Sequence, residues 1–237
     1  MELLKRKIDK FLVEWKNSTD KKPLIVKGAR QIGKTESIRK FAKNNYKSVI
    51  EINFVLQKQY KDIFDDGFEV DTIIKNISLR NPNLEIIPGD TLIFFDELQD
   101  CINCATSLKA FNQDGRYDVI CSGSLMGINY NEIESNSVGN KEDYEMYSMD
   151  FEEFLWAKGY KEEQIESLYQ HMKNLTPLSE TELSVMFENF KEYMVIGGMP
   201  AIVNNFVKNK NYSGTLFPYC ANRSSFSLCV EYFLKVY

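Results

Sequence analysis

One stretch of eight residues constrains this chain more than any other, because it matches the spacing G-x-x-x-x-G-K-[ST] at every specified position. It consists of Gly28, Ala29, Arg30, Gln31, Ile32, Gly33, Lys34 and Thr35. Its two glycines let the backbone turn so tightly that successive N–H groups point at one anion, and a helix that starts at the end of the loop adds its positive N-terminus. We therefore interpret residues 28–35 as a phosphate-binding loop.

The residues around this loop have the pattern that a phosphate-binding loop requires. Residues 23–27 form a short apolar run that predicts a strand, and residues 36–44 place apolar side chains on one face of a predicted helix. In this setting Lys34 would reach the β- and γ-phosphates of a nucleotide, and the Thr35 hydroxyl would ligate Mg²⁺. The alternative is a glycine-containing surface turn, which the flanking strand and helix disfavour.

A second motif lies at residues 91–97, where a continuous apolar run ends in two carboxylates. Such a run is typical of a central parallel strand whose carboxyl end lies at an active site. We expect Asp96 to hold Mg²⁺, mostly through water, and Glu97 to orient or deprotonate the water that attacks the γ-phosphate. A solvated strand end is the alternative, but the upstream loop favours a nucleotide site.

Strands alternate with helices over roughly the first 150 residues, which predicts an α/β protein with a parallel sheet covered by helices on both sides. Ligands of such sheets bind at the carboxyl ends of the strands. The further strands are expected at 48–54, 117–124 and 144–149, and the further helices at 3–16, 56–80 and 101–113.

Small polar residues end the strand predicted at 117–124. A hydroxyl at this strand end, beside the strand that carries Asp96, can bond the attacking water or the γ-phosphate. We therefore select Ser124 as a catalytic residue, with Ser122 as the second candidate. A glycine-and-serine turn without chemistry is the alternative.

Composition and charge exclude several classes of function. The chain has 237 residues, 43% hydrophobic and 27% charged, which is enough for one α/β domain and a smaller appendage. A formal net charge of −5 argues against coating of nucleic acid by bulk electrostatics, although a local basic patch is left open. The first 15 residues alternate charged and apolar side chains and predict neither a signal peptide nor a membrane span. We therefore expect a cytoplasmic protein, and because the five cysteines are odd in number and no secretory signal is predicted, we expect reduced thiols.

Five segments together resemble the AAA-type P-loop ATPases of the bacterial and archaeal "ATP-binding protein" family, in which an AAA domain precedes a C-terminal domain of unknown function. In order from about residue 20 to 205, they read KGARQIGKT, DTLIFFDELQ, DGRYDVICSGSLMG, YEMYSMDFEEFLWAKG and YMVIGGMPAIV. The resemblance implies an AAA+ core with a five-stranded parallel sheet in the order 5-1-4-3-2, a small helical lid, and ATP as the substrate. It assigns hydrolysis to Lys34, Thr35, Asp96 and Glu97.

The resemblance also implies a division of the chain. Residues 1–150 would form the P-loop ATPase core, and residues 151–210 a helical lid region. Residues 211–237 match nothing in the family. We therefore expect an atypical tail in a truncated or frame-disrupted copy that lacks the family's C-terminal domain.

One charged group of the family is missing from its usual span. No arginine occurs between Arg116 and Arg223, where an AAA+ subunit normally carries its arginine finger and lid sensor. Lys141 lies near the finger position, but a lysine lacks the planar fork and would stabilise a transferring phosphoryl group less well. An ordinary solvated loop lysine is the alternative.

These observations predict ATP binding and slow, Mg²⁺-dependent ATP hydrolysis, with ATP and Mg²⁺ as cofactors and weak activity in the truncated form. The chain could form a homo-oligomer through the AAA core. Two alternatives stay open: a nucleotide-gated binding module whose turnover is incidental, and an ATPase that depends on DNA or RNA. Glu97 favours hydrolysis, whereas the missing arginine favours the binding module.

Overall fold

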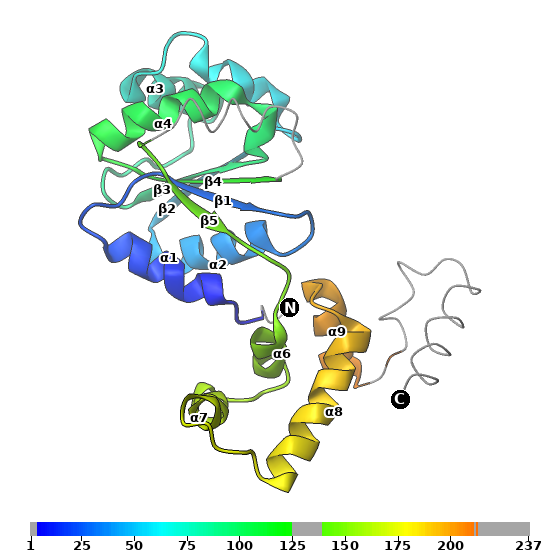
Figure 1. Ribbon diagram of the computed structural model, residues 1–237. Coiled ribbons are helices and arrows are strands. Elements are labelled where there is room, and N and C mark those ends of the chain that lie inside the picture. The colour runs from blue at the N-terminus through cyan, green and yellow to red at the C-terminus, as the bar shows by residue number, and fades with distance from the viewer. Residues whose placement is uncertain (1–3, 125–138, 211, 213–237) are drawn as a thin grey trace. The chain divides into compact units, whose positions relative to one another are not determined.

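Among the residues that the computed structural model describes, 4–124, 139–210 and 212, five parallel strands form one sheet (Figure 1). They lie in the order β2-β3-β4-β1-β5, which confirms the expected α/β fold and strand order. The strands are β1 (Leu24–Gly28), β2 (Ser48–Asn53), β3 (Thr91–Asp96), β4 (Asp118–Ser124) and β5 (Glu142–Glu145).

Helices cover both faces of this sheet (Figure 1). On one face lie α1 (Lys7–Asn17) and α2 (Lys34–Asn45), and on the other α3 (Val70–Arg80), α4 (Ile102–Asp114) and the 3-10 turn η1 (Lys58–Phe64). A second 3-10 turn, η2 (Leu98–Asp100), follows β3.

The central strands are buried on both sides because their successive side chains enter different hydrophobic clusters. In β3, Ile93 and Phe95 pack with α3 and α4, whereas Leu92 and Phe94 pack with α1 and α2. Every residue of β1 and of β3 is buried. This alternation explains why the sequence of a central strand reads as one continuous apolar run.

Several elements differ from their predicted bounds, and the helix expected at 3–16 begins only at Lys7. The single helix expected at 56–80 is instead η1 and α3, separated at Gly67, whose φ of +125° lies in a region that an α-helix cannot use. The fifth strand, expected at 144–149, spans Glu142–Glu145. It ends there because its partner β1 ends at Gly28, where the loop begins.

The chain divides into two compact units between Tyr147 and Ser148. The second unit is helical in its described part, with α6 (Phe151–Ala157), α7 (Glu162–Lys173), α8 (Glu180–Ile196) and α9 (Pro200–Asn209). Side-chain caps begin two of these helices: Asp150 accepts from the N–H of Glu153, and Ser179 from that of Glu182.

Aromatic side chains hold α6 against α8 and α9. The ring of Phe154, fully buried, lies 5.4 Å from that of Tyr193 and 6.2 Å from that of Phe206. Throughout the part of the chain that the structure describes, we find no helix with the length and apolar character needed to cross a membrane. The predicted tail, apart from Tyr212, lies outside the described residues.

Candidate nucleotide-binding site

The loop between β1 and α2 adopts a conformation that ordinary residues rarely take. Gly28 has a φ of +154°, Gln31 one of +64°, and Gly33, which precedes the first residue of α2, one of +92°. A Cβ on Gly28 would lie 2.2 Å from the carbonyl oxygen of Met146, so this position has no room for a side chain. The tight turn that the motif predicts is therefore present, and α2 begins directly after it.

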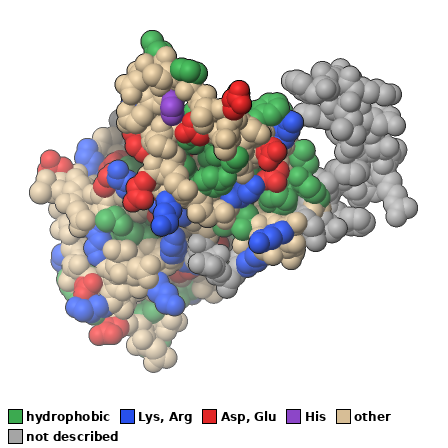
Figure 2. Space-filling model, turned by 90° about the horizontal axis from the view of Figure 1, so that it is seen from below, with side chains coloured by type: hydrophobic (Ala, Val, Ile, Leu, Met, Phe, Trp, Pro, Cys, Tyr) green, Lys and Arg blue, Asp and Glu red, His purple; other side chains and the backbone are tan. Residues whose placement is uncertain are grey.

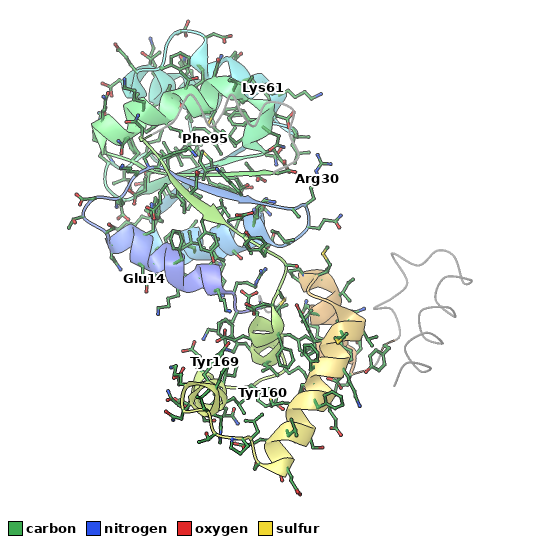
Figure 3. All side chains as sticks on the ribbon, viewed as in Figure 1. Glu14, Arg30, Lys61, Phe95, Tyr160 and Tyr169 are labelled. Atoms are coloured by element: carbon green, nitrogen blue, oxygen red, sulfur yellow. The ribbon has the colours of Figure 1, made fainter. Side chains whose placement is uncertain are left out.

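The loop side chains differ in exposure. Ile32 is buried against the core of the first unit, whereas Ala29, Arg30 and Gln31 are exposed. Figure 3 shows Arg30 at the end of the sheet where β1 and β4 finish.

Lys34 lies inside the loop and close to the acidic residues of β3. Its Nζ donates hydrogen bonds to the carbonyl oxygens of Gly28, at 3.0 Å, and Ala29, at 2.6 Å. Burial lowers the pKa of Lys34, and the charges of Glu97 and Asp96 oppose this effect. The structure thus brings the predicted phosphate-binding cation and the two predicted carboxylates to the same place.

Asp96 is the most heavily bonded side chain of the site. Its carboxylate accepts from the Thr35 hydroxyl at 3.3 and 3.4 Å, from the Asn53 side-chain amide at 3.0 Å, from the Ser122 hydroxyl, and from the Glu97 N–H at 3.1 Å. It is only 5% exposed. The three side-chain donors come from α2, β2 and β4, so three elements fix the orientation of one carboxylate.

Glu97 stands in a strained backbone conformation directly after β3, with φ +58° and ψ +50°. The side-chain Nε2 of Gln99 donates to the Glu97 carboxylate, while the side-chain Oε1 of Gln99 accepts from the N–H of Ser124 at 3.1 Å. Gln99 therefore connects the carboxylate after β3 with the end of β4. Ser124 is buried and lies beside Gly28 in the β1–β4 pairing, and a role for its hydroxyl stays a prediction.

Sequence reasoning missed Asn53 and Gln99. Asn53 ends β2 and pairs with Asp96 in the register of the sheet, so a polar residue at the end of an adjacent predicted strand was the available signal. Gln99 carried no such signal, because its role depends on the turn that η2 makes after β3.

Lys141 lies at the other end of the sheet from the loop. It precedes Glu142, the register partner of Leu24 at the start of β1. Its side chain is only 7% exposed and its Nζ is bonded to Asp143, which also accepts from Lys27 at 2.8 Å. Lys141 is therefore a half-buried lysine paired with Asp143, which differs from the solvated loop lysine considered above.

The oxygens of Thr35 and Asp96 fit a Mg²⁺ ion that the protein and the phosphates of a nucleotide would hold together. No group of three or more His, Cys, Asp or Glu side chains that could hold a metal occurs within 4–124, 139–210 or 212. Mg²⁺ needs no such cage, because it usually takes one or two protein oxygens and completes its shell with phosphate oxygens and water. The Thr35 hydroxyl and the Asp96 carboxylate, 3.3 Å apart, would provide those two oxygens.

A parallel sheet in this order, with a phosphate-binding loop after β1 and an acidic pair at the end of β3, defines a P-loop nucleotide-binding fold. A family model described as an AAA domain matches residues 20–155. The chain therefore belongs to this AAA family of nucleotide-binding ATPases, as the sequence segments predicted. No curated protein matches the sequence.

Solved structures that the chain resembles include PCH-2 from C. elegans and the ORC1 protein from Aeropyrum pernix, the latter in complex with DNA. PCH-2 is 10% identical, with a TM-score of 0.39, over 76% of this chain and 51% of its own. ORC1 is 13% identical, with a TM-score of 0.39, over 63% of this chain and 46% of its own. The chain thus spans about half the length of each, and at these scores neither likeness indicates what this chain acts on.

Proposed function

We propose that this chain binds ATP together with Mg²⁺ and hydrolyses it slowly. The observation that supports the proposal best is the convergence of Lys34, Thr35 and Asp96 at one end of the sheet. A cation for the phosphates and two oxygens for Mg²⁺ are the groups that phosphoryl transfer needs first.

Each residue has a separate role in this proposal. The loop amides of residues 28–35 bind the phosphates, and Lys34 exchanges its two carbonyl partners for phosphate oxygens. Thr35 and Asp96 hold Mg²⁺, which when bound would neutralise charge on the phosphates. Ser124 binds the attacking water or the γ-phosphate.

Glu97 is the proposed base for the attacking water. Its carboxylate is oriented by the Gln99 amide and by a backbone conformation that few residues adopt. A chain that only switched between two bound states would not need a carboxylate held in this way, so Glu97 favours hydrolysis.

Turnover should nevertheless be slow. An arginine that stabilises the transferring phosphoryl group is worth about 10³ to 10⁵ in rate, and no arginine occurs between Arg116 and Arg223. Lys141 does not replace it within the chain, because its ammonium is bonded to Asp143 at the far end of the sheet.

The partners of this chain are part of the proposal. Basic and acidic side chains are intermixed on the face seen in Figure 2, and the formal net charge is −5, so neither favours binding of nucleic acid. We propose a nucleotide-binding protein of the cytoplasm whose AAA core could pair with further copies. DNA- or RNA-dependent turnover is an outcome of the test.

The test combines ATP–Mg²⁺ binding with phosphate release, with and without DNA or RNA. Lys34→Ala should weaken binding by tenfold or more, whereas Lys43→Ala, an exposed lysine of α2, should not. Glu97→Gln should keep the affinity and cut turnover by about 10²-fold.

If Lys34→Ala binds ATP within about threefold of the parent, which is under about 1 kcal/mol, the loop assignment is wrong. If the parent binds ATP but turns over no faster than Glu97→Gln, the chain is the nucleotide-gated module.

A further inference from the structure

A buried arginine links the phosphate-binding loop to the point where the two units of the chain meet in sequence. Arg6 immediately precedes α1 and is 5% exposed. Its Nη1 donates to the carbonyl oxygen of Ile32 at 2.7 Å, and its Nη2 donates to that of Tyr147 at 2.8 Å. One planar guanidinium therefore bonds two backbone positions that lie far apart in the sequence.

The bond to Ile32 affects the loop directly. The carbonyl of Ile32 and the N–H of Gly33 belong to one planar trans peptide group, so they point in opposite directions. When Arg6 draws the carbonyl toward α1, the Gly33 N–H must point away from α1. Arg6 therefore orients one of the amides that the loop can offer to a phosphate.

The bond to Tyr147 reaches the last residue of the first unit. The residue before it, Met146, donates its N–H to the Lys27 carbonyl at 2.8 Å, and its carbonyl oxygen lies against Gly28. Residues 146–147 are thus fixed to both ends of the phosphate-binding loop, through Gly28 and through Arg6.

Within the second unit, the residue after Ser148 is fixed as well. Met149 donates its N–H to the carbonyl of Gly198 at 2.7 Å and accepts from the Tyr193 hydroxyl at 2.8 Å. The residue before Ser148 is therefore hydrogen-bonded within the first unit, and the residue after it is hydrogen-bonded within the second.

We propose that Arg6 is a positioning residue that couples the phosphate-binding loop to the segment 146–149, so that nucleotide at the loop changes the backbone where the helical unit begins. The inference rests on the nucleotide binding proposed above. A lysine at position 6 would carry the charge but lacks the fork that holds both carbonyls at once.

The test is hydrogen exchange of two protected amides, Ser37, which bonds to the Gly33 carbonyl, and Met146, compared among the parent, Arg6→Ala and Arg6→Lys. Asp9→Ala, at the start of α1, is the matched control. The Asp9 carboxylate accepts from the backbone N–H of Arg6 and from Lys40, so its loss disturbs the same region. The two carbonyls that accept from the Arg6 guanidinium are left in place. Without nucleotide, both Arg6 variants should exchange faster at both amides than Asp9→Ala does.

With ATP and Mg²⁺, exchange at Met146 should slow in the parent and in Asp9→Ala, and this response should be lost in Arg6→Ala and Arg6→Lys. ATP affinity should fall by about tenfold in Arg6→Ala, as expected when a charged hydrogen-bond donor is removed. If Arg6→Ala does not fold, Arg6→Lys carries the test.

The outcomes separate the two proposals. A parent that binds no ATP overturns the proposed function, and the exchange without nucleotide then decides the link made by Arg6. The other outcome is that the parent binds ATP, but the Arg6 variants show the same amide exchange, and the same change with ATP, as Asp9→Ala. This result overturns the role of Arg6 and leaves nucleotide binding intact.

Discussion

The sheet of the first unit and the helix α8 of the second bury their side chains to very different extents. Every residue of β1 and β3 is buried, and the hydrophobic clusters on both faces of the sheet consist of residues from the first unit. In α8, which is described over its full length, the buried residues are Asn189 and Ile196. An apolar row on α8 is instead exposed: Leu183 by 58%, Phe187 by 51%, Phe190 by 42% and Met194 by 49%.

This difference in burial indicates which part of the chain has to hold side chains in fixed positions. The residues proposed to handle phosphate follow fully buried strands, and their orientation depends on donors from neighbouring strands. Residues that stand on packed strands can be held to within a fraction of an ångström, which phosphoryl transfer requires. The helical unit relies on aromatic contacts and helix caps, and these tolerate more surface exposure.

The largest effect should come from a core phenylalanine of the sheet. Phe95, labelled in Figure 3, is fully buried, and its ring stacks on that of Phe54 at 5.6 Å. We expect Phe95→Ala to lower the free energy of unfolding by about 3–5 kcal/mol, against less than about 1 kcal/mol for Phe187→Ala on α8. Urea unfolding followed by circular dichroism measures both. Equal losses would remove the contrast between the two regions.

A pair of glycines sharpens the comparison. A Cβ would lie 2.2 Å from the carbonyl oxygen of Met146 at Gly28, and 2.1 Å from that of Met149 at Gly198. Both alanine variants should lose about 1–3 kcal/mol of stability through overpacking. Isothermal titration should show a clearly larger loss of ATP binding for Gly28→Ala, because Gly28 belongs to the loop itself, whereas a side chain at Gly198 meets Met149 at the start of the helical unit. Equal losses of ATP affinity in the two variants would contradict the assignment of the loop.

A smaller effect is expected from the donors around Asp96. Ser122→Ala removes one hydrogen bond to a buried carboxylate and should cost about 1–2 kcal/mol. It should also raise the Mg²⁺ concentration needed for ATP binding. Ser107→Ala, which removes a buried hydroxyl that donates to Cys104 within α4, is the control. A Mg²⁺ titration in which the two variants behave alike would show that Ser122 serves stability alone.

The smallest effect is expected at Lys141. Because its ammonium is bonded to Asp143, Lys141→Ala should leave the ATPase rate per subunit within about twofold of the parent at every protein concentration. A series of rates against concentration provides the measurement. If the parental rate rises with concentration and the variant's does not, Lys141 acts on a neighbouring copy after all.

The fold could be predicted from the sequence because its signals are local. The apolar run that became β3 and the loop spacing at residues 28–35 each report on their own few residues, and the strand order came from the family resemblance. The break at Gly67 was missed because the apolar periodicity continues across it.

The candidate site could be predicted only in part. Lys34, Thr35, Asp96 and Glu97 are found by their motifs, and the structure places them together. The residues that orient them cannot be found in this way, because Asn53 and Arg6 bond to partners far away in the sequence. A hydrogen bond between distant positions leaves no trace in the spacing of either residue.

The position of β1 inside the sheet has a consequence for the order in which the protein can be built. Leu24 pairs with Ile120 on one side and with Glu142 on the other, so both neighbours of β1 are made long after it. During synthesis the phosphate-binding loop leaves the ribosome before either neighbour of its strand exists to hold it. Closing contacts between such distant segments is slow. We therefore expect the nascent chain to gain the ability to bind nucleotide only after β5 has emerged from the ribosome. Nucleotide binding would then be a late event in the synthesis of the chain.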